Sequence, residues 1–263
     1  MTTTAEPKRV VPFGEDYDNA DLCYACSKWL SYLVTFIAVA LSLADTIYSL
    51  DKNTSENIGY ANTALICLYL FFEYRGSYLF RTAETKRKLA FIDNTFNTKF
   101  SEAETQEYYT NDNVAGGIYK MAVNNMESSF TTNKNLTHMY PIVLTKNVVI
   151  VMLVVFAGIF GKGNYARLAA ESLVAANFAL ELFKITVYSS KVKTLLNEFF
   201  TLFQSLNPET ITNVQSAQIM KQILEYETTV AWANLPLDND YFMKHRVAWD
   251  GEWQKLKLRY NIR

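Results

Sequence analysis

LSYLVTFIAVALSLADTIYSL, residues 30–50, is the stretch that decides the fold, because it is apolar around the whole helix circumference and has no glycine or proline. Residues 58–80, 142–161 and 166–188 are comparable stretches, so the chain has two close pairs of apolar segments. Each segment has about the 20 residues that an α-helix needs to cross a hydrocarbon core about 30 Å thick. We therefore predict an all-α integral membrane protein with four transmembrane helices.

Short polar turns connect the two segments of each pair. The turn DKNTSEN at residues 51–57 contains Asp, Asn and Ser, which favour chain reversal, and the turn at residues 161–164 contains two glycines. Each pair is therefore predicted to form an antiparallel helical hairpin. The predicted segments are a cytosolic N-terminal segment (1–29), a first transmembrane hairpin (30–80), a cytosolic helical segment (81–141), a second transmembrane hairpin (142–188) and a cytosolic helical tail (189–263).

Lysine and arginine flank the predicted spans unevenly, and this sets the expected orientation. The two hairpin turns hold only Lys52, Lys162 and Arg167. Because positive residues near span ends are retained in the cytoplasm, we expect both termini and the middle segment to face the cytoplasm of a cell whose inner membrane the chain crosses several times. The basic residues on the cytoplasmic side are Lys8, Arg9, Lys28, Arg81, Lys86, Arg87, Lys88, Lys134, Lys146, Lys191 and Lys193.

Composition and motifs argue against several function classes. A net charge of −1 gives no electrostatic reason to bind a nucleic acid polymer. Cys23 and Cys26 form a lone CxxC pair without a second pair, so we expect no metal. The phosphate-loop, dinucleotide, zinc-protease and nucleophile-elbow motifs are all missing. We therefore expect no catalytic residues, no enzyme activity and no cofactor.

Four ionisable residues within the predicted spans are candidates for function. Charged groups are costly in lipid and usually face a bundle interior or water. We predict that Glu73, Arg75, Glu181 and Lys184 pair with one another at the inner ends of the helices and hold a closed arrangement that can open. The alternative is that these side chains lie near the interface and extend their charged ends to it.

The middle segment combines tyrosine with basic residues, which is the combination that a nucleotide requires, because aromatic rings stack on bases and cations hold phosphates. The alternative is that the tyrosines cover helix pairs and that the basic cluster is attracted to anionic lipid. The predicted ligand-binding residues are Lys86, Arg87, Lys88, Tyr108, Tyr109, Tyr119 and Lys120.

Helices are also predicted outside the spans. Residues 81–91 continue the second span, Asp93-Asn94 and Asn97-Thr98 break it, and residues 114–130 show apolar residues at helical spacing. Residues from 189 continue the fourth span until Pro208, and a further helix is predicted from Asn213 to about Trp232. Apolar faces on these helices pack within a cytosolic domain or against another subunit.

Three strings in the middle segment carry a family resemblance: KRKLAFIDNTFNT at 86–98, TQEYYTND at 105–112 and GGIYKMAVNNMESSFTT at 116–132. Together with the order of hairpin, segment, hairpin and tail, they resemble the bacterial four-span effectors associated with SMODS nucleotide-cyclase antiphage systems. The resemblance implies a pore-forming effector that oligomerises and breaches the inner membrane on an intracellular signal such as a cyclic oligonucleotide.

The expected function is therefore membrane permeabilisation in antiphage defence, with the lipid bilayer and further copies of the chain as partners. Two alternatives stay open. A small transporter or constitutive channel predicts spans broken by Gly or Pro around a site near mid-membrane, whereas the spans here are mostly unbroken. A membrane anchor or scaffold that recruits a soluble partner predicts no conductance.

Overall fold

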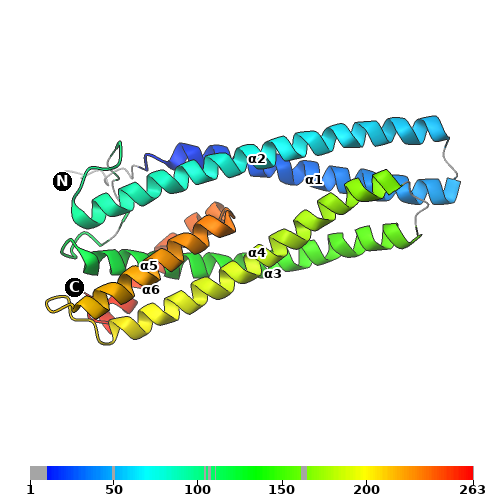
Figure 1. Cartoon of the computed structure of the whole chain (residues 1–263). Coiled ribbons are helices and arrows are strands. Elements are labelled where there is room, and N and C mark those ends of the chain that lie inside the picture. The colour runs from blue at the N-terminus through cyan, green and yellow to red at the C-terminus, as the bar shows by residue number, and fades with distance from the viewer. Residues whose placement is uncertain are drawn as a thin grey trace, which may run out of the picture. The chain divides into compact units, whose positions relative to one another are not determined.

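The described residues of this computed structural model form six α-helices and no strand (Figure 1). Residues 11–48, 51–103, 105, 108–109, 111–160 and 165–262 are described, and within them the side chains of 52, 157–158, 160 and 165–175 are not. The predicted all-α class is confirmed. The helices are α1 (Gly14–Tyr48), α2 (Lys52–Phe96), α3 (Ile118–Phe160), α4 (Tyr165–Phe203), α5 (Asn213–Ala233) and α6 (Asn239–Arg259).

Two helices in the described part of the chain are long and apolar enough to cross a membrane, α1 and the Ile118–Phe156 part of α3. Their most apolar 18-residue stretches are only 28% and 11% buried, whereas the core helix of a soluble protein is mostly buried. α2 does not qualify, because Asn62, Glu73 and Arg75 lower the hydropathy of its apolar stretch. Length and composition therefore support two spans, where the sequence predicted four.

The chain packs as two units, and each is described by itself. Unit 1 comprises the described residues of ranges 1–17, 80–139 and 187–263, and unit 2 comprises those of 18–79 and 140–186. Unit 1 thus contains the end of α2, the start of α3, the end of α4, and all of α5 and α6. Unit 2 contains most of α1 and the remaining parts of α2, α3 and α4.

Unit 1 has a continuous apolar core. It is formed where the predicted helical faces meet, and α6, which lies in the predicted helical tail, adds Trp249 and Trp253 to it. Burial of large side chains of this kind is the main favourable term in folding, at roughly 1.5–3 kcal/mol each. The buried side chains that periodicity had placed on apolar faces are Met121, Ala122, Met126, Phe130, Leu195, Leu196, Phe199, Phe203, Ile219, Ile223 and Tyr226.

In unit 2, α1 has small polar side chains on its buried face and large aromatic side chains on its exposed face. Ser27 and Ser31 are buried there, whereas Trp29 and Phe36 are 71% and 70% exposed. Small residues on the inner face let helices approach closely. A Cβ added at Gly76 of α2 would lie only 3.2 Å from the Tyr24 ring of α1. The helices of unit 2 therefore pack through small and polar side chains together with a small apolar core around Val34 and Phe178, and large side chains such as Trp29 and Phe36 face outward.

Cap residues set several helix ends. Thr212 and Gln215 form a reciprocal capping box at the start of α5, and Asn234, with φ of 44°, ends it in the left-handed region. Asp238 caps α6. Asn97, with φ of 55°, follows the last residue of α2. The predicted helix after Asn213 and the predicted break at Asn97 are both confirmed, whereas the break predicted at Asp93-Asn94 is wrong, because α2 continues through these residues to Phe96.

The hairpin turn predicted at residues 51–57 is placed differently. α2 begins at Lys52, because Oδ2 of Asp51 accepts a hydrogen bond from the Thr54 amide at 3.2 Å and so caps the helix. The predicted turn residues therefore belong to the first turns of α2. α3 likewise continues through Pro141 as one helix. The second predicted turn, residues 161–164, lies outside the described residues.

Candidate functional site

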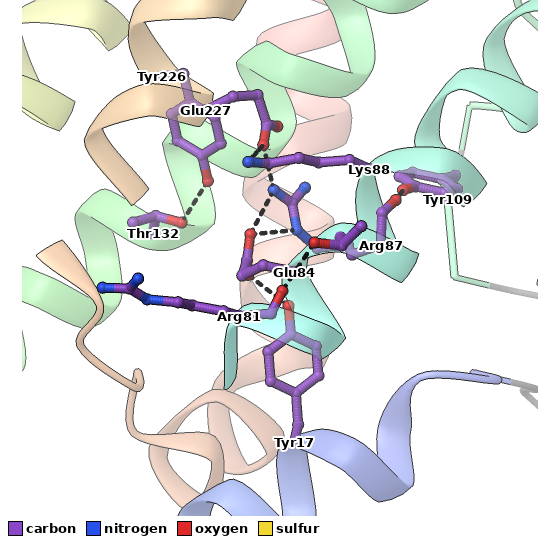
Figure 2. A network of polar contacts seen from close by, with 10 residues as sticks. Tyr17, Arg81, Glu84, Arg87, Lys88, Tyr109, Thr132, Tyr226 and Glu227 are labelled. Atoms are coloured by element: carbon purple, nitrogen blue, oxygen red, sulfur yellow. Dashed lines mark hydrogen bonds and ion pairs between the residues drawn. The ribbon is translucent and has the colours of Figure 1, made fainter. Parts of the chain in front are cut away.

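Unit 1 contains a buried ion-pair network centred on Arg87 of α2 (Figure 2). Its Nη2 atom lies 2.9 Å from Oε2 of Glu84, one turn earlier on the same helix. The same nitrogen lies 2.5 Å from Oε2 of Glu227 on α5. Nζ of Lys88 is 3.9 Å from that Glu227 oxygen. The network therefore joins α2 to α5 through charged groups.

Arg87 remains charged although it is buried. Burial by itself lowers the pKa of Arg87, but the carboxylates of Glu84 and Glu227 outweigh it and raise that pKa well above its ordinary value. Oε1 of Glu227 is buried and has no hydrogen-bond partner among the described residues. Such a pair adds little net stability, but removal of one member leaves a buried charge without compensation. The network is thus suited to hold one particular packing of α2 against α5.

Hydroxyl groups bring further elements of unit 1 to this network (Figure 2). Tyr17 at the start of α1 donates to Oε1 of Glu84. Tyr109, in the connection between α2 and α3, donates to the backbone carbonyl of the central arginine at 3.5 Å. The Thr132 and Tyr226 hydroxyls, on α3 and α5, lie 2.9 Å apart. Burial raises the pKa of Tyr109 well above its ordinary value, so this phenol stays neutral.

The residues predicted to bind a nucleotide fall into different environments. Lys86 is at the surface, where its Nζ lies 2.6 Å from Oδ2 of Asp16. Arg87 and Lys88 belong to the buried network. The Tyr108 ring packs edge-on against Tyr109, with centroids 4.8 Å apart. The basic groups therefore already have carboxylate partners within the protein.

The remaining two predicted ligand residues lie elsewhere in unit 1. Tyr119 is buried in the core, with its ring centroid 5.8 Å from that of Phe203. Lys120 is also buried, and its Nζ lies 3.9 Å from Oδ1 of Asp112. The structure thus brings Arg87, Lys88 and Tyr109 together in one network and does not place Tyr119 in it.

Glu181 of α4, in unit 2, has a different partner from the one predicted. Both of its carboxylate oxygens accept from Nζ of Lys146 on α3, at 2.8 and 2.9 Å. Nδ2 of Asn147 donates to Oε2 of Glu181 at 2.9 Å. Within the described residues Lys184 makes no ion pair with a glutamate. The partner of Glu181 is therefore Lys146 on α3, and not Lys184, which lies one turn further along α4.

The other two charged residues of the predicted span network lie on α2. Oε2 of Glu73 accepts from Oγ of Ser27 on α1 at 2.9 Å. The Arg75 guanidinium lies over the Tyr78 ring, 5.6 Å from its centroid. The two side chains thus have separate partners, as their two-residue spacing on a helix requires.

A second polar network in unit 1 was not predicted from the sequence. Nδ2 of Asn111 donates to Oδ1 of Asn124 at 2.9 Å and to Oε2 of Glu127 at 2.6 Å. Oδ1 of Asn111 accepts from the Trp253 indole at 3.3 Å and from Nζ of Lys257 at 3.4 Å. Asn111 is fully buried, so this network fixes the connection between α2 and α3 against α6.

Histidine and cysteine do not form a metal site in the described part of the chain. No group of three or more His, Cys, Asp or Glu there is arranged to hold a metal ion. His138 stacks on Tyr241 with ring centroids 3.6 Å apart, and His245 contacts the other side of the same cluster at 4.1 Å. Cys23 and Cys26 are free thiols. The two histidines, His138 on α3 and His245 on α6, are therefore part of an aromatic cluster around Tyr241 of α6.

Comparison of this chain with protein-family models, with curated proteins and with solved structures finds no match. The functional assignment therefore depends on the residues and contacts described above.

Proposed function

We propose that the chain is a non-enzymatic inner-membrane protein whose two helical hairpins, 30–80 and 142–188, permeabilise the membrane in response to an intracellular signal during antiphage defence. Unit 1 faces the cytoplasm in this proposal, together with both termini. Further copies of the chain associate with it to form the permeable assembly. The signal is a small anionic molecule of the cyclic oligonucleotide class.

The observation that carries the proposal is the extent of exposed apolar surface on unit 2, whose apolar core is small. Among its described residues, Trp29, Phe36 and Ile159 are each about 70% exposed, and Ser27, Ser31 and Asn147 are buried. Large contiguous apolar surfaces on a protein require a covering partner. A lipid bilayer covers such a surface around the whole helix bundle, and packing through small and polar residues is typical of helices in membranes.

The buried Arg87 network supplies the candidate signal-responsive element. It joins α2, which continues from unit 2 into unit 1, to α5 through paired charges. A ligand carrying phosphates competes for the same cations, because phosphates and carboxylates bind guanidinium in the same way. We propose that ligand binding exchanges Glu84 and Glu227 for phosphate and thereby releases α5 from α2.

One observation favours a second candidate, a membrane anchor for a soluble partner. The exposed residues of unit 1 include Leu224 and Val247 on its two C-terminal helices, at 60% and 85% exposure. A surface of that kind is also suited to recruit a protein. The anchor differs from the effector in one measurable respect, which is the lack of any conductance.

Expression in a bacterium that carries a potential-sensitive dye tests the proposal. The chain is expressed with and without an enzyme that synthesises cyclic oligonucleotides, and an inactive variant of that enzyme serves as the matched control. We expect depolarisation only when the active enzyme is present. Full membrane potential under every condition, with the chain detected in the membrane, would overturn the effector and favour the anchor.

A further inference from the structure

Unit 2 contains hydrogen-bonded polar side chains from parts of all four of its helices. Ser27 of α1 donates to Glu73 of α2, and Lys146 and Asn147 of α3 donate to Glu181 of α4. These two hydrogen-bonded groups, five residues in all, are together called the polar layer below. Ionisable side chains within a membrane cost free energy, and where they occur they usually have a function. Rings of polar side chains in pores select ions by their charge.

The polar layer carries an excess negative charge. It has two carboxylates, Glu73 and Glu181, and one ammonium group, that of Lys146, which is used by Glu181 at 2.8 and 2.9 Å. Glu73 accepts only from the Ser27 hydroxyl in the described part of the chain, at 2.9 Å. Arg75 lies over the Tyr78 ring and forms no ion pair with Glu73. One carboxylate therefore lacks a cationic partner.

A separate observation points to a ligand at this place. Asn147 is fully buried, and its Nδ2 donates to Glu181 at 2.9 Å and to the Phe178 carbonyl at 3.0 Å. Its Oδ1 is buried as well, and no described residue donates a hydrogen bond to it. Because Nδ2 of the same amide donates a hydrogen bond to Glu181, this unpaired oxygen lies close to the Glu181 carboxylate. A buried amide oxygen without a donor is a natural ligand for a cation.

The second buried amide of unit 2 has the same property. Asn62 of α2 is buried, and its Oδ1 also has no donor among the described residues. Asn62 lies closer to the start of α2 than Glu73, by three helical turns. Unpaired amide oxygens thus occur at more than one depth of the bundle, as expected where an ion exchanges between sites.

We propose that the polar layer of unit 2 binds a monovalent cation and makes the permeability of the assembly selective for cations over anions. This inference rests on the proposed function for the location of unit 2 in a membrane. A monovalent ion fits because one unpaired carboxylate with hydroxyl and amide oxygens is a weak ligand set, whereas divalent ions need several carboxylates. No such group occurs in the described part of the chain.

Reversal potentials in proteoliposomes under a potassium chloride gradient test the inference, with cyclic oligonucleotide inside or outside the vesicles. Four proteins form a charge series in the polar layer: Lys146→Gln, wild type, Glu73→Gln and the double variant Glu73→Gln with Glu181→Gln. We expect the preference for potassium over chloride to fall in that order, by about tenfold per unit charge. Glu209→Gln, an exposed carboxylate of unit 1, is the matched control and should equal the wild type.

A binding measurement separates this inference from the proposed function. The thermal unfolding temperature of the purified protein in detergent is compared in potassium chloride and in N-methylglucamine chloride of equal ionic strength. We expect potassium to raise the unfolding temperature of the wild type relative to N-methylglucamine. Glu73→Gln or Asn147→Leu should remove this increment. If the vesicles do not conduct but the increment is present, only the permeabilising function fails. A conductance that is equal for both ions in all four proteins, or no increment in the wild type, would overturn the cation site.

Discussion

Unit 1 has a large apolar core that contains Trp253, Phe199 and Met126, and it pairs buried Arg87 with two largely buried carboxylates. Unit 2 has only a small apolar core around Val34 and Phe178, buries serine and asparagine beside it, and exposes Trp29 and Phe36. The two units contain parts of the same long helices, so helix propensity does not explain the difference. The proposed function explains the difference by what each surface contacts. Unit 1 packs as a protein does in water, where apolar area is removed from solvent, and unit 2 packs as helices do in lipid, where small and polar residues form the contacts.

Arg87→Met is expected to have the largest effect on stability, and it tests whether unit 1 depends on paired charges. The substitution removes the cation that pairs with Glu84 and leaves Glu227 only the more distant Lys88, at 3.9 Å, and breaking a buried pair in this way typically costs about 3–5 kcal/mol. Guanidinium unfolding in detergent measures this, followed by the fluorescence of Trp249 and Trp253 in the unit 1 core.

Lys134→Met is the matched variant for that experiment. Its ion pair with Glu252 is short, at 2.7 Å, but both side chains are more than a third exposed. We expect it to cost less than about 1 kcal/mol, because water screens exposed pairs. Equal losses of unfolding free energy in the two variants would show that burial does not strengthen the Arg87 network. The comparison of the two units would then be wrong on this point.

The same substitution placed in each unit tests the comparison directly. Met152 of unit 2 and Val247 of unit 1 are both exposed apolar residues, at 65% and 85%. Met152→Arg should reduce the amount of chain in carbonate-washed membranes, since arginine at the centre of a span costs about 2.5–3.5 kcal/mol. Val247→Arg should leave that amount unchanged. If neither variant alters the membrane fraction, the exposed apolar surface of unit 2 does not face lipid.

Local patterns in the sequence account for much of the fold. The extension of the second apolar segment beyond Arg81, the helix after Asn213 and the buried face that contains Ile219 and Ile223 were all predicted correctly, because each depends on residues three or four apart. The tail after residue 189 was predicted to be helical, but the bounds of α6 were not, since it is rich in charged and aromatic residues and has little apolar periodicity. Helical structure was likewise predicted before position 30, but not that it forms one continuous helix with the first span from Gly14 onward.

The partners in the candidate site could not be predicted in this way. Arg87 was predicted to hold a phosphate, but its principal partner, Glu227, is 140 residues away in the sequence. Likewise, Glu181 was predicted to pair within the spans, and its partner Lys146 was counted only as a flanking charge. Periodicity identifies which side of a helix is buried, but not which helix meets it. Such pairings follow from tertiary packing, which a single sequence does not display.

Asp93 provides the smallest expected effect, and it tests how unit 1 holds a carboxylate outside its core. Its Oδ1 accepts from the Phe100 amide at 2.8 Å and its Oδ2 from the Ser101 amide at 2.7 Å. Burial acts to raise the pKa of Asp93, but these hydrogen bonds outweigh it and lower the pKa from 3.8 to about 2. Because the folded pKa is depressed, the stabilisation is present above pH 3.8 and is lost as the pH falls through about 2.

Amide hydrogen exchange at Phe100 and Ser101, corrected for the intrinsic rate, measures this loss. We expect protection in the wild type to decline between about pH 4 and pH 2, and Asp93→Asn to be less protected already at neutral pH and to show no such decline. Asp112→Asn is the matched control, because the Asp112 side chain is 74% exposed. Protection that is independent of pH in the wild type would mean that the connection after α2 is held by other contacts. In that case the hydrogen bonds that Asp93 accepts would stabilise unit 1 no more than Glu73, which accepts from a single described hydroxyl group, stabilises unit 2.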